Sequence, residues 1–327
     1  FLSKKSKFSF HLFRNINTNI DDALKLIELI SIDNLKYLRF AGYELSSLNI
    51  GEFITFLDNL NPLLDNKSPF LNLTHDYLIT HNSVMERIAI FTWINNLMTE
   101  HNLLENLNKS NHRDGYKWQK TMEIMLETNP AYASCISEQI ISFNKSNFTS
   151  LIRDNHVTKV AILTLEINFD LAWNNYSQLL LETPYSLLFS KIFNLGLSSN
   201  RNTHTLFSDK ERNKKILDWC KLYPEIARRI IRYTPLFSDT GEWFDFTFKM
   251  IIEFGNREEF LNELSSNFHS MTTVGSRVPY LESRKKLLEK LIHLNILNLT
   301  NWVEKQIEYF NKQIKIEKIT DAQEGLR

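Results

Sequence analysis

The scarcity of glycine and proline constrains the fold of this chain more than any other feature. Only 8 glycines and 7 prolines occur in 327 residues, whereas average usage would give roughly 23 and 16. Few turns can therefore adopt the positive φ that tight hairpins need, which disfavours a β-sandwich, a barrel or a doubly wound sheet. We predict an all-α chain whose helices are joined by short polar connections.

Apolar residues recur at helical spacing along most of the sequence. Val303, Ile307 and Phe310 show the spacing near the C-terminal end, and in the stretch 84–98 only Asn95 interrupts it. Such spacing is typical of amphipathic helices. The pattern predicts helices near residues 19–30, 33–47, 51–60, 83–100, 114–127, 131–144, 157–181 (with a break), 184–195, 209–222, 224–233, 241–254, 257–268, 280–294 and 300–318.

Capping boxes predict where several of these helices begin. In a capping box, a polar N-cap side chain and a glutamate three residues later satisfy the free amides of the first turn. The sequence spells this pattern at Ser83–Glu86, Ser208–Glu211, Asp239–Glu242 and Asn256–Glu259. We also expect Ser276 to cap the helix that follows it, with Pro279 in the first turn, where its missing amide hydrogen costs nothing.

The spacing of the later helices predicts a repeat architecture. From residue 209 onward the predicted helices come in pairs about 30 to 40 residues apart, the spacing of two-helix solenoid repeats. We therefore predict an irregular HEAT-like α-solenoid of antiparallel helix hairpins. The segment 61–82, which holds two prolines and scattered asparagines, and the polar segment 197–209, which lacks periodicity, are predicted to be domain breaks or long loops. They indicate an N-terminal helical bundle at 1–70, a middle helical region at 71–205 and C-terminal HEAT-like helix pairs at 206–327.

Nucleotide-binding loops are excluded by glycine spacing. A phosphate cradle needs several closely spaced glycines, and the nearest pair here is Gly42 and Gly51, too far apart for a P-loop or a dinucleotide fingerprint. The triplet at 112–114 matches part of a kinase catalytic loop, but Gln119 stands where that loop needs an asparagine. We expect Asp114 to cap the following helix.

Metal and nucleophile chemistry also lack their residue patterns. Cys135 and Cys220 are far apart in the sequence, and His75 and His81 are six apart in a predicted loop, so neither pair has zinc-ligand spacing. We expect inert, buried thiols, no cofactor and no catalysis by this chain alone. An enzyme assembled from distant carboxylates or histidines stays open as a third hypothesis, and metal analysis of the purified protein tests it.

Charge and hydropathy give further limits. The 38 basic and 38 acidic residues cancel, so no overall field draws the protein towards nucleic acid or an anionic membrane. The sequence has no run of 18 apolar residues, and we expect no membrane-spanning helix. Two cysteines in a chain of this length suit a reducing compartment, which predicts a cytoplasmic location.

Two basic stretches supply the candidate binding residues. The first holds Arg212, Lys214, Lys215, Arg228, Arg229 and Arg232, and the second holds Arg277, Arg284, Lys285 and Lys286. If adjacent hairpins stack, these side chains can line one groove and contact an anionic partner such as a nucleic-acid backbone. The other interpretation is an ordinary charged face of amphipathic helices.

Two stretches resemble a known class of repeats. "NLKYLRFAGYELSSLNIGEFITFLDNL" at 34–60 and "GSRVPYLESRKKLLEKLIHLNILNLTNWVEKQIEYFNKQIKIEK" at 275–318 resemble irregular helical repeats of large bacterial antiphage defence proteins. The resemblance implies a scaffold or sensor region that binds a protein partner through a concave face, beside an effector or NTPase module. It also leads us to expect a piece of a longer polypeptide. A nucleic-acid-binding helical-repeat protein is the alternative.

Overall fold

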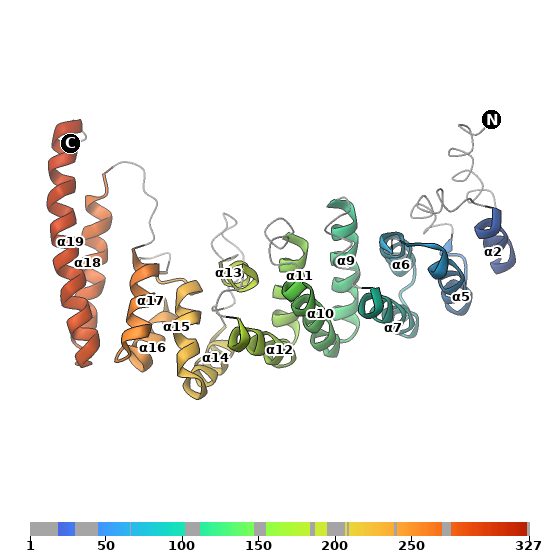
Figure 1. Ribbon diagram of the computed structural model, residues 1–327, viewed down its shortest axis with the longest axis horizontal. Coiled ribbons are helices and arrows are strands. Elements are labelled where there is room, and N and C mark those ends of the chain that lie inside the picture. Colours follow the sequence, from blue (N-terminus) through green and yellow to red (C-terminus); the bar gives the residue numbers. More distant parts are fainter. Residues whose placement is uncertain are drawn as a thin grey trace. The chain divides into compact units, whose positions relative to one another are not determined.

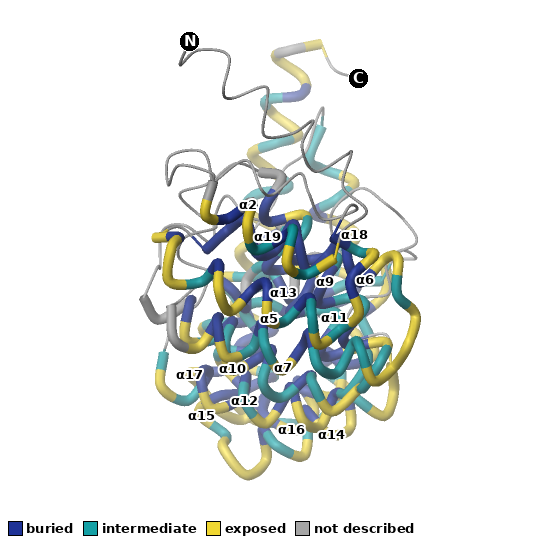
Figure 2. The backbone as a smooth tube through the Cα atoms, turned by 90° about the vertical axis from the view of Figure 1, so that its right-hand side faces the viewer, coloured by how far each residue is buried: buried dark blue, intermediate teal, exposed yellow. Residues whose placement is uncertain are grey.

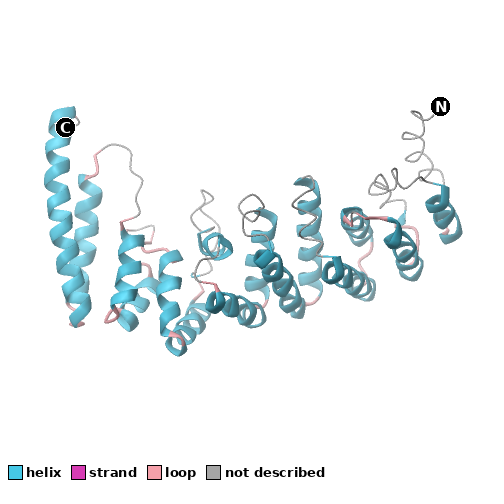
Figure 3. Cartoon of the chain, viewed as in Figure 1, coloured by secondary structure: helices cyan, strands magenta, loops and turns pink. Residues whose placement is uncertain are grey.

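The computed structural model is built of α-helices (Figures 1 and 3). It describes residues 19–29, 45–65, 67–101, 112–146, 155–183, 187–194, 207, 209–238, 241–269 and 276–325. Within these ranges there is no β-strand, and the only extended pairing is a bridge between Phe237 and Trp243. The all-α prediction is therefore confirmed. Contacts divide the chain into two compact units, residues 1–179 and 180–327.

Unit 1 contains the helices of the first half of the chain. They are α2 (Ile20–Leu29), α5 (Ile50–Leu60), α6 (Ser68–Thr80), α7 (Val84–His101), α9 (His112–Thr128), α10 (Ala133–Ser146) and α11 (Asn155–Ile167), with 3-10 turns η3 (Asn61–Leu63) and η4 (Pro130–Tyr132). The boundary between the units falls within α12 (Phe169–Glu182). Alternate helices pack together, α6 with α9 and α9 with α11, while α7 and α10 pack against members of that layer.

Unit 2 repeats the same scheme. Its helices are α13 (Leu187–Asn194), α14 (Lys210–Leu222), α15 (Pro224–Tyr233), α16 (Asp245–Phe254), α17 (Glu258–Phe268), α18 (Val278–Ile292) and α19 (Leu297–Glu324). Here α15 packs on α17 and α17 on α19, while α14 pairs with α15 and α18 with α19. Along most helices other than α6, buried and exposed stretches alternate (Figure 2), as amphipathic helices require when one face is buried.

An aromatic cluster holds the end of unit 2 together. Phe268 of α17 lies between Trp243 of the loop before α16 and Phe310 of α19, with ring centroids 5.7 and 5.6 Å away. The indole of Trp243 also donates a hydrogen bond to the carbonyl oxygen of Leu287 in α18. Buried aromatic pairs of this kind contribute beyond their area, so this cluster ties three successive elements to one core.

Parts of the predicted organisation need correction. The segment 61–82 is not a break, because it holds η3 and the helix α6, in which every residue from Ser68 to Leu78 is buried. Pro69 lies in the first turn of α6, where proline is tolerated. The proposed domain boundary near residue 70 falls at the start of this helix. The predicted helix at 33–47 lies largely outside the described residues, as does the boundary near 205.

Two helix starts differ from the capping boxes that the sequence spells. α7 begins at Val84, directly after Ser83, and Asp239 lies outside the described residues. A capping box forms at Asn49, whose side chain accepts from the amide of Glu52 while the Glu52 carboxylate accepts from Asn49. Asp209 caps α14, one residue after the predicted position. At α17 the cap residue is Arg257, without a side-chain cap, so the prediction at Asn256 is wrong.

No helix in the described part of the chain combines the length and the apolar character that a membrane crossing requires.

Candidate functional site

Three of the sequence-predicted basic residues join neighbouring elements of unit 2. Arg232 of α15 donates from Nε and Nη2 to the two carboxylate oxygens of Glu263 in α17, at 2.8 and 2.9 Å. Arg277 donates to Glu317 of α19 at 2.9 Å. Arg229 donates to the carbonyl oxygens of residues 180 and 181 near the end of α12, where helix carbonyls lack internal partners. These side chains are occupied by structural contacts.

Arg284 is occupied in a different way. Its guanidinium lies 3.1 Å from the ring centroid of Phe237 and 4.6 Å from that of Tyr280, an aromatic contact that suits a planar cation. Burial lowers the pKa of Arg284, while the hydrogen bond and charge of Tyr280 act in the opposite direction. The residue therefore packs within the α18 region of unit 2 and does not point freely into solvent.

The other predicted residues lie at the surface. Arg212 is 3.9 Å from Asp209, and Lys285 is 3.9 Å from Glu289. The side chains of Lys214, Arg228 and Lys286 are exposed and form no ion pair or hydrogen bond within the described chain. The remaining predicted residue, Lys215, is exposed on α14. The pKa of Asp209 is lowered chiefly because its carboxylate accepts a hydrogen bond from the amide of Arg212, and the charges of Arg212 and Lys215 act in the same direction. The charges of α14 and α15 belong to one pair of packed helices, and those of α18 belong to the pair that it forms with α19.

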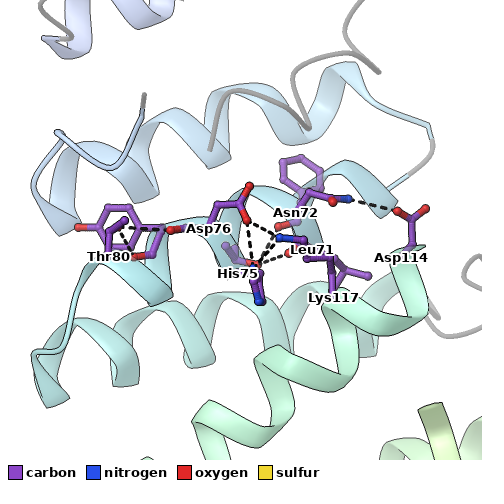
Figure 4. Close-up of polar contacts among 10 residues, drawn as sticks. Leu71, Asn72, His75, Asp76, Thr80, Asp114 and Lys117 are labelled. Carbon is purple, nitrogen blue, oxygen red and sulfur yellow. Dashed lines mark hydrogen bonds and ion pairs between the residues drawn. The ribbon is translucent and has the colours of Figure 1, made fainter. Parts of the chain in front are cut away.

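A buried polar cluster in unit 1 was not foreseen from the sequence (Figure 4). The ammonium of Lys117 in α9 donates to the carboxylate of Asp76 at 2.5 Å and to Nδ1 of His75 at 2.9 Å, both in α6. Nδ1 of His75 also lies 3.0 Å from the same carboxylate oxygen of Asp76, so the three side chains form one buried polar contact. His75, which the sequence placed in a loop, thus lies in a buried helix.

The cluster continues along the contact between α6 and α9. Asn72, 2% exposed, donates to the carboxylate of Asp114 at 3.2 Å. Asp114 lies in the first turn of α9, so its carboxylate meets a side chain of α6 and the expectation of a cap is corrected. A carboxylate near a helix N-terminus is also stabilised by the helix dipole. Both contacts lie between the same two helices, which they fix in register.

The electrostatics of the cluster suit a structural role. Burial alone would raise the pKa of Asp76, but hydrogen bonds from His75 and Lys117 and the charge of Lys117 outweigh it, so the pKa lies below its ordinary value. The side chains of His75, Asp76 and Lys117 are 9%, 8% and 13% exposed, leaving little access for a substrate. The described residues also contain no group of three or more metal-ligating side chains.

Exposed apolar side chains mark a different surface in unit 2. The turns α14–α15, α16–α17 and α18–α19 lie at one edge of the unit (Figure 1). Leu222 and Leu297 are 75% and 73% exposed there, beside Tyr223 at 40% and Ile252 at 46%. We call these four residues the turn edge. Leu222 and Leu297 belong to the first and the third of these turns, with the α16–α17 turn between them.

Polar contacts confirm that the three turns are neighbours. Lys221 of α14 lies 3.5 Å from Glu253 of α16. Asn298 of α19 donates through its side chain to the carbonyl oxygen of Asn256, in the α16–α17 turn, at 2.7 Å. Gly255 lies against Leu299. The α16–α17 turn therefore lies between the other two, and the turn edge is a strip along three neighbouring turns.

Each exposed leucine of the turn edge lies close to a residue typical of turns. Leu222 and Tyr223 directly precede Pro224, which begins a helix, and Leu297 follows Asn295, whose φ of 55° marks a turn.

Comparison with protein-family models, with curated proteins and with solved structures finds no match to the chain.

Proposed function

We propose that this chain is a non-catalytic helical-repeat region that binds a protein partner through the turn edge of unit 2. The observation that carries the proposal is the exposure of Leu222 and Leu297, 75% and 73%, on the two outer turns of one edge. Burying such side chains in an interface removes apolar surface from water, which is favourable.

The packing within each unit supports an irregular HEAT-like solenoid as the scaffold. In such an array, each helix pair buries its apolar face only against its neighbours. Both units show this local rule, with alternate helices in one layer and their hairpin partners beside them. Solution scattering tests the solenoid, since a compact globular scattering curve contradicts it.

The charges around the turn edge define the partner's chemistry. Exposed carboxylates at Asp218, Glu225 and Glu253 flank the strip, with Lys221 as a cation shared between two of them. The partner that fits is a segment with apolar side chains and basic flanks, because complementary charge favours encounter and discriminates between partners.

Paired substitutions test the docking site. We expect Leu222→Asp combined with Leu297→Asp to weaken partner binding at least tenfold, because each introduces a charge into a desolvated contact. Stability should change little, since both positions are exposed. The matched control is Met85→Asp, at a 74% exposed apolar residue of unit 1. Crosslinking in cells that carry the native gene identifies the partner. Recovery of equal amounts of partner with the native chain, the double variant and the control excludes the turn edge as the docking site.

The nucleic-acid alternative has less support. Arg229, Arg232 and Arg277 are engaged in contacts between elements, which leaves few cations for phosphates. A salt titration with single-stranded and duplex nucleic acid tests it, because phosphate contacts make log affinity fall steeply with log salt. Salt-sensitive binding that is lost when Lys214, Arg228 and Lys286 are changed to alanine favours this alternative.

A role in a bacterial antiphage defence complex, in the cytoplasm and beside an effector or NTPase module, completes the proposal. It rests on the resemblance of the stretches 34–60 and 275–318 to repeats of such proteins. Phage plating on cells with and without the gene tests it directly. Unchanged plating after deletion removes the defence role and leaves the docking site to be judged by its own variants.

A further inference from the structure

A polar pocket lies between α7 and α10 in unit 1, apart from the turn edge. It encloses about 380 Å³, within the size range of small-ligand sites. Its lining is Asn95, Met98, Thr99, Cys135, Glu138, Gln139 and Ser142. Asn95 is the residue that interrupts the apolar pattern of α7, so the pocket gives that interruption a structural context.

One hydrogen bond joins the two walls. The side-chain amide of Gln139 donates to Oδ1 of Asn95 at 2.6 Å. Asn175 of α12 donates to the hydroxyl of Ser137 at 2.8 Å, to the carbonyl oxygen of Ser134 at 3.0 Å and to Oε1 of Glu138 at 3.5 Å. The same carboxylate oxygen accepts from the hydroxyl of Ser134 at 3.3 Å. The wall that carries Glu138 and Gln139 is therefore held from α12 as well as across the pocket.

Several lining groups retain hydrogen-bonding capacity. Oε1 of Gln139 is buried and accepts no hydrogen bond from the described residues, and the hydroxyl of Ser142 has no partner there either. By contrast, Thr99 donates to the carbonyl oxygen of residue 95, and the thiol of Cys135 donates to that of residue 132. A buried carbonyl oxygen without a donor is unfavourable, so the pocket is best satisfied by a ligand rich in N–H donors.

The charge of the pocket points to a cation. Glu138 is its only charged lining residue, and no basic side chain lines it. Burial, and then the charge of Glu138, raise the pKa of Cys135 to about 11, so the thiol stays protonated and supplies neither a nucleophile nor a metal-binding thiolate. The acceptors that the lining offers are the Glu138 carboxylate, the free amide oxygen of Gln139 and the hydroxyl of Ser142.

From these observations we infer that the pocket binds a guanidinium group. A guanidinium carries five N–H donors in a planar fork, so one group can donate to Gln139, Ser142 and the Glu138 carboxylate together. Its positive charge is matched by Glu138, and its weak hydration suits a partly enclosed site. The group can come from an arginine side chain of a bound protein or from a free guanidinium compound.

Side-chain amide NMR tests the site directly. Acetyl-arginine-methylamide should shift the amide signals of Gln139 and Asn95, with a Kd on the order of 1 mM, and the neutral acetyl-citrulline-methylamide should not. Glu138→Gln should weaken binding at least about fivefold, because hydrogen bonds to charged groups are the stronger ones. Glu127→Gln, an exposed carboxylate on α9, is the matched control.

Two further arms make the result decisive. Gln139→Leu should also weaken binding, with the Asn95 signal as the remaining probe, so the test survives if one variant is unstable. Methylguanidinium alone separates the sources: tighter binding of the arginine derivative assigns the group to a protein segment, and equal binding assigns it to a free compound. Unmoved amide signals, equal shifts with the citrulline derivative, or unchanged affinity in Glu138→Gln overturn the inference.

Discussion

At the scale of single residues, the pair Lys117 and Asp76 is the most consequential buried contact. Removing one member of a buried ion pair leaves the other charge buried without a partner and costs about 3–5 kcal/mol, whereas removing both members is far less destabilising. We therefore expect Lys117→Met to lower the free energy of unfolding by several kcal/mol and the double variant with Asp76→Asn to recover much of it. Urea unfolding followed by circular dichroism measures the stability of the single and the double variant. A double variant that is no more stable than Lys117→Met would contradict a coupled pair.

The same carboxylate predicts a pH dependence of stability. The pKa of Asp76 is lowered in the folded chain and is about 3.9 when unfolded. Its stabilising contribution is thus fully present above pH about 4 and is lost as the pH falls through the folded pKa, because the unfolded state binds the proton more readily. We expect the free energies of unfolding of the native chain and of Asp76→Asn, measured between neutral and acidic pH, to become equal as the pH falls. A constant difference across the range would remove this assignment.

At the scale of elements, the α16–α17 turn gives a sharp test of how closely helices approach. A Cβ added to Gly255 would overlap the carbonyl oxygen of Ile251 and contact Leu299 of α19, so Gly255→Ala should destabilise by about 1–3 kcal/mol. Gly51 lies in α5 with only an ordinary contact to Asn49. Gly51→Ala should stabilise by about 0.5–1 kcal/mol, since alanine is the better helix former. Thermal unfolding shows whether each variant is more or less stable than the native chain. Similar stability changes in the two variants would contradict the close approach at Gly255.

Elements with one buried face could be predicted from sequence, and the others could not. The long C-terminal hairpin was predicted at 280–294 and 300–318. α18 overlaps the first range and α19 covers the second, because their apolar stripes follow the helical period. The segment of α6 is buried on every side, so no amphipathic period marked it. The break within 157–181 was expected and falls at Asn168, whose side chain accepts from the amide of Leu171.

Contacts between residues far apart in the sequence could not be predicted at the candidate sites either. The sequence correctly located basic residues on helices of unit 2, but it could not show that Arg232 meets a carboxylate 31 residues away. Lys117 and Asp76 are also separated by 41 residues. Such partners depend on which helices pack together, and local periodicity carries no information about that choice.

At the scale of the whole molecule, stability in a chain of nearest-neighbour contacts should be local. α6 and α9 pack with one another and with other helices of unit 1. In unit 2, α15, α17 and α19 form a layer of their own. In repeat arrays, the energetic effect of a change falls on the altered repeat and its neighbours. A variant at Lys117 should therefore open unit 1 selectively.

Hydrogen exchange provides the measurement for this last expectation. We expect Lys117→Met to speed amide exchange in α6, α7, α9 and α11, because these helices share contacts around the lost pair. Exchange in α15, α17 and α19 should stay within error of the native chain, and Gly255→Ala should give the reverse pattern. A uniform increase over all helices in either variant would mean one cooperative globular domain and would rule out the repeat scaffold on which the proposed docking function is built.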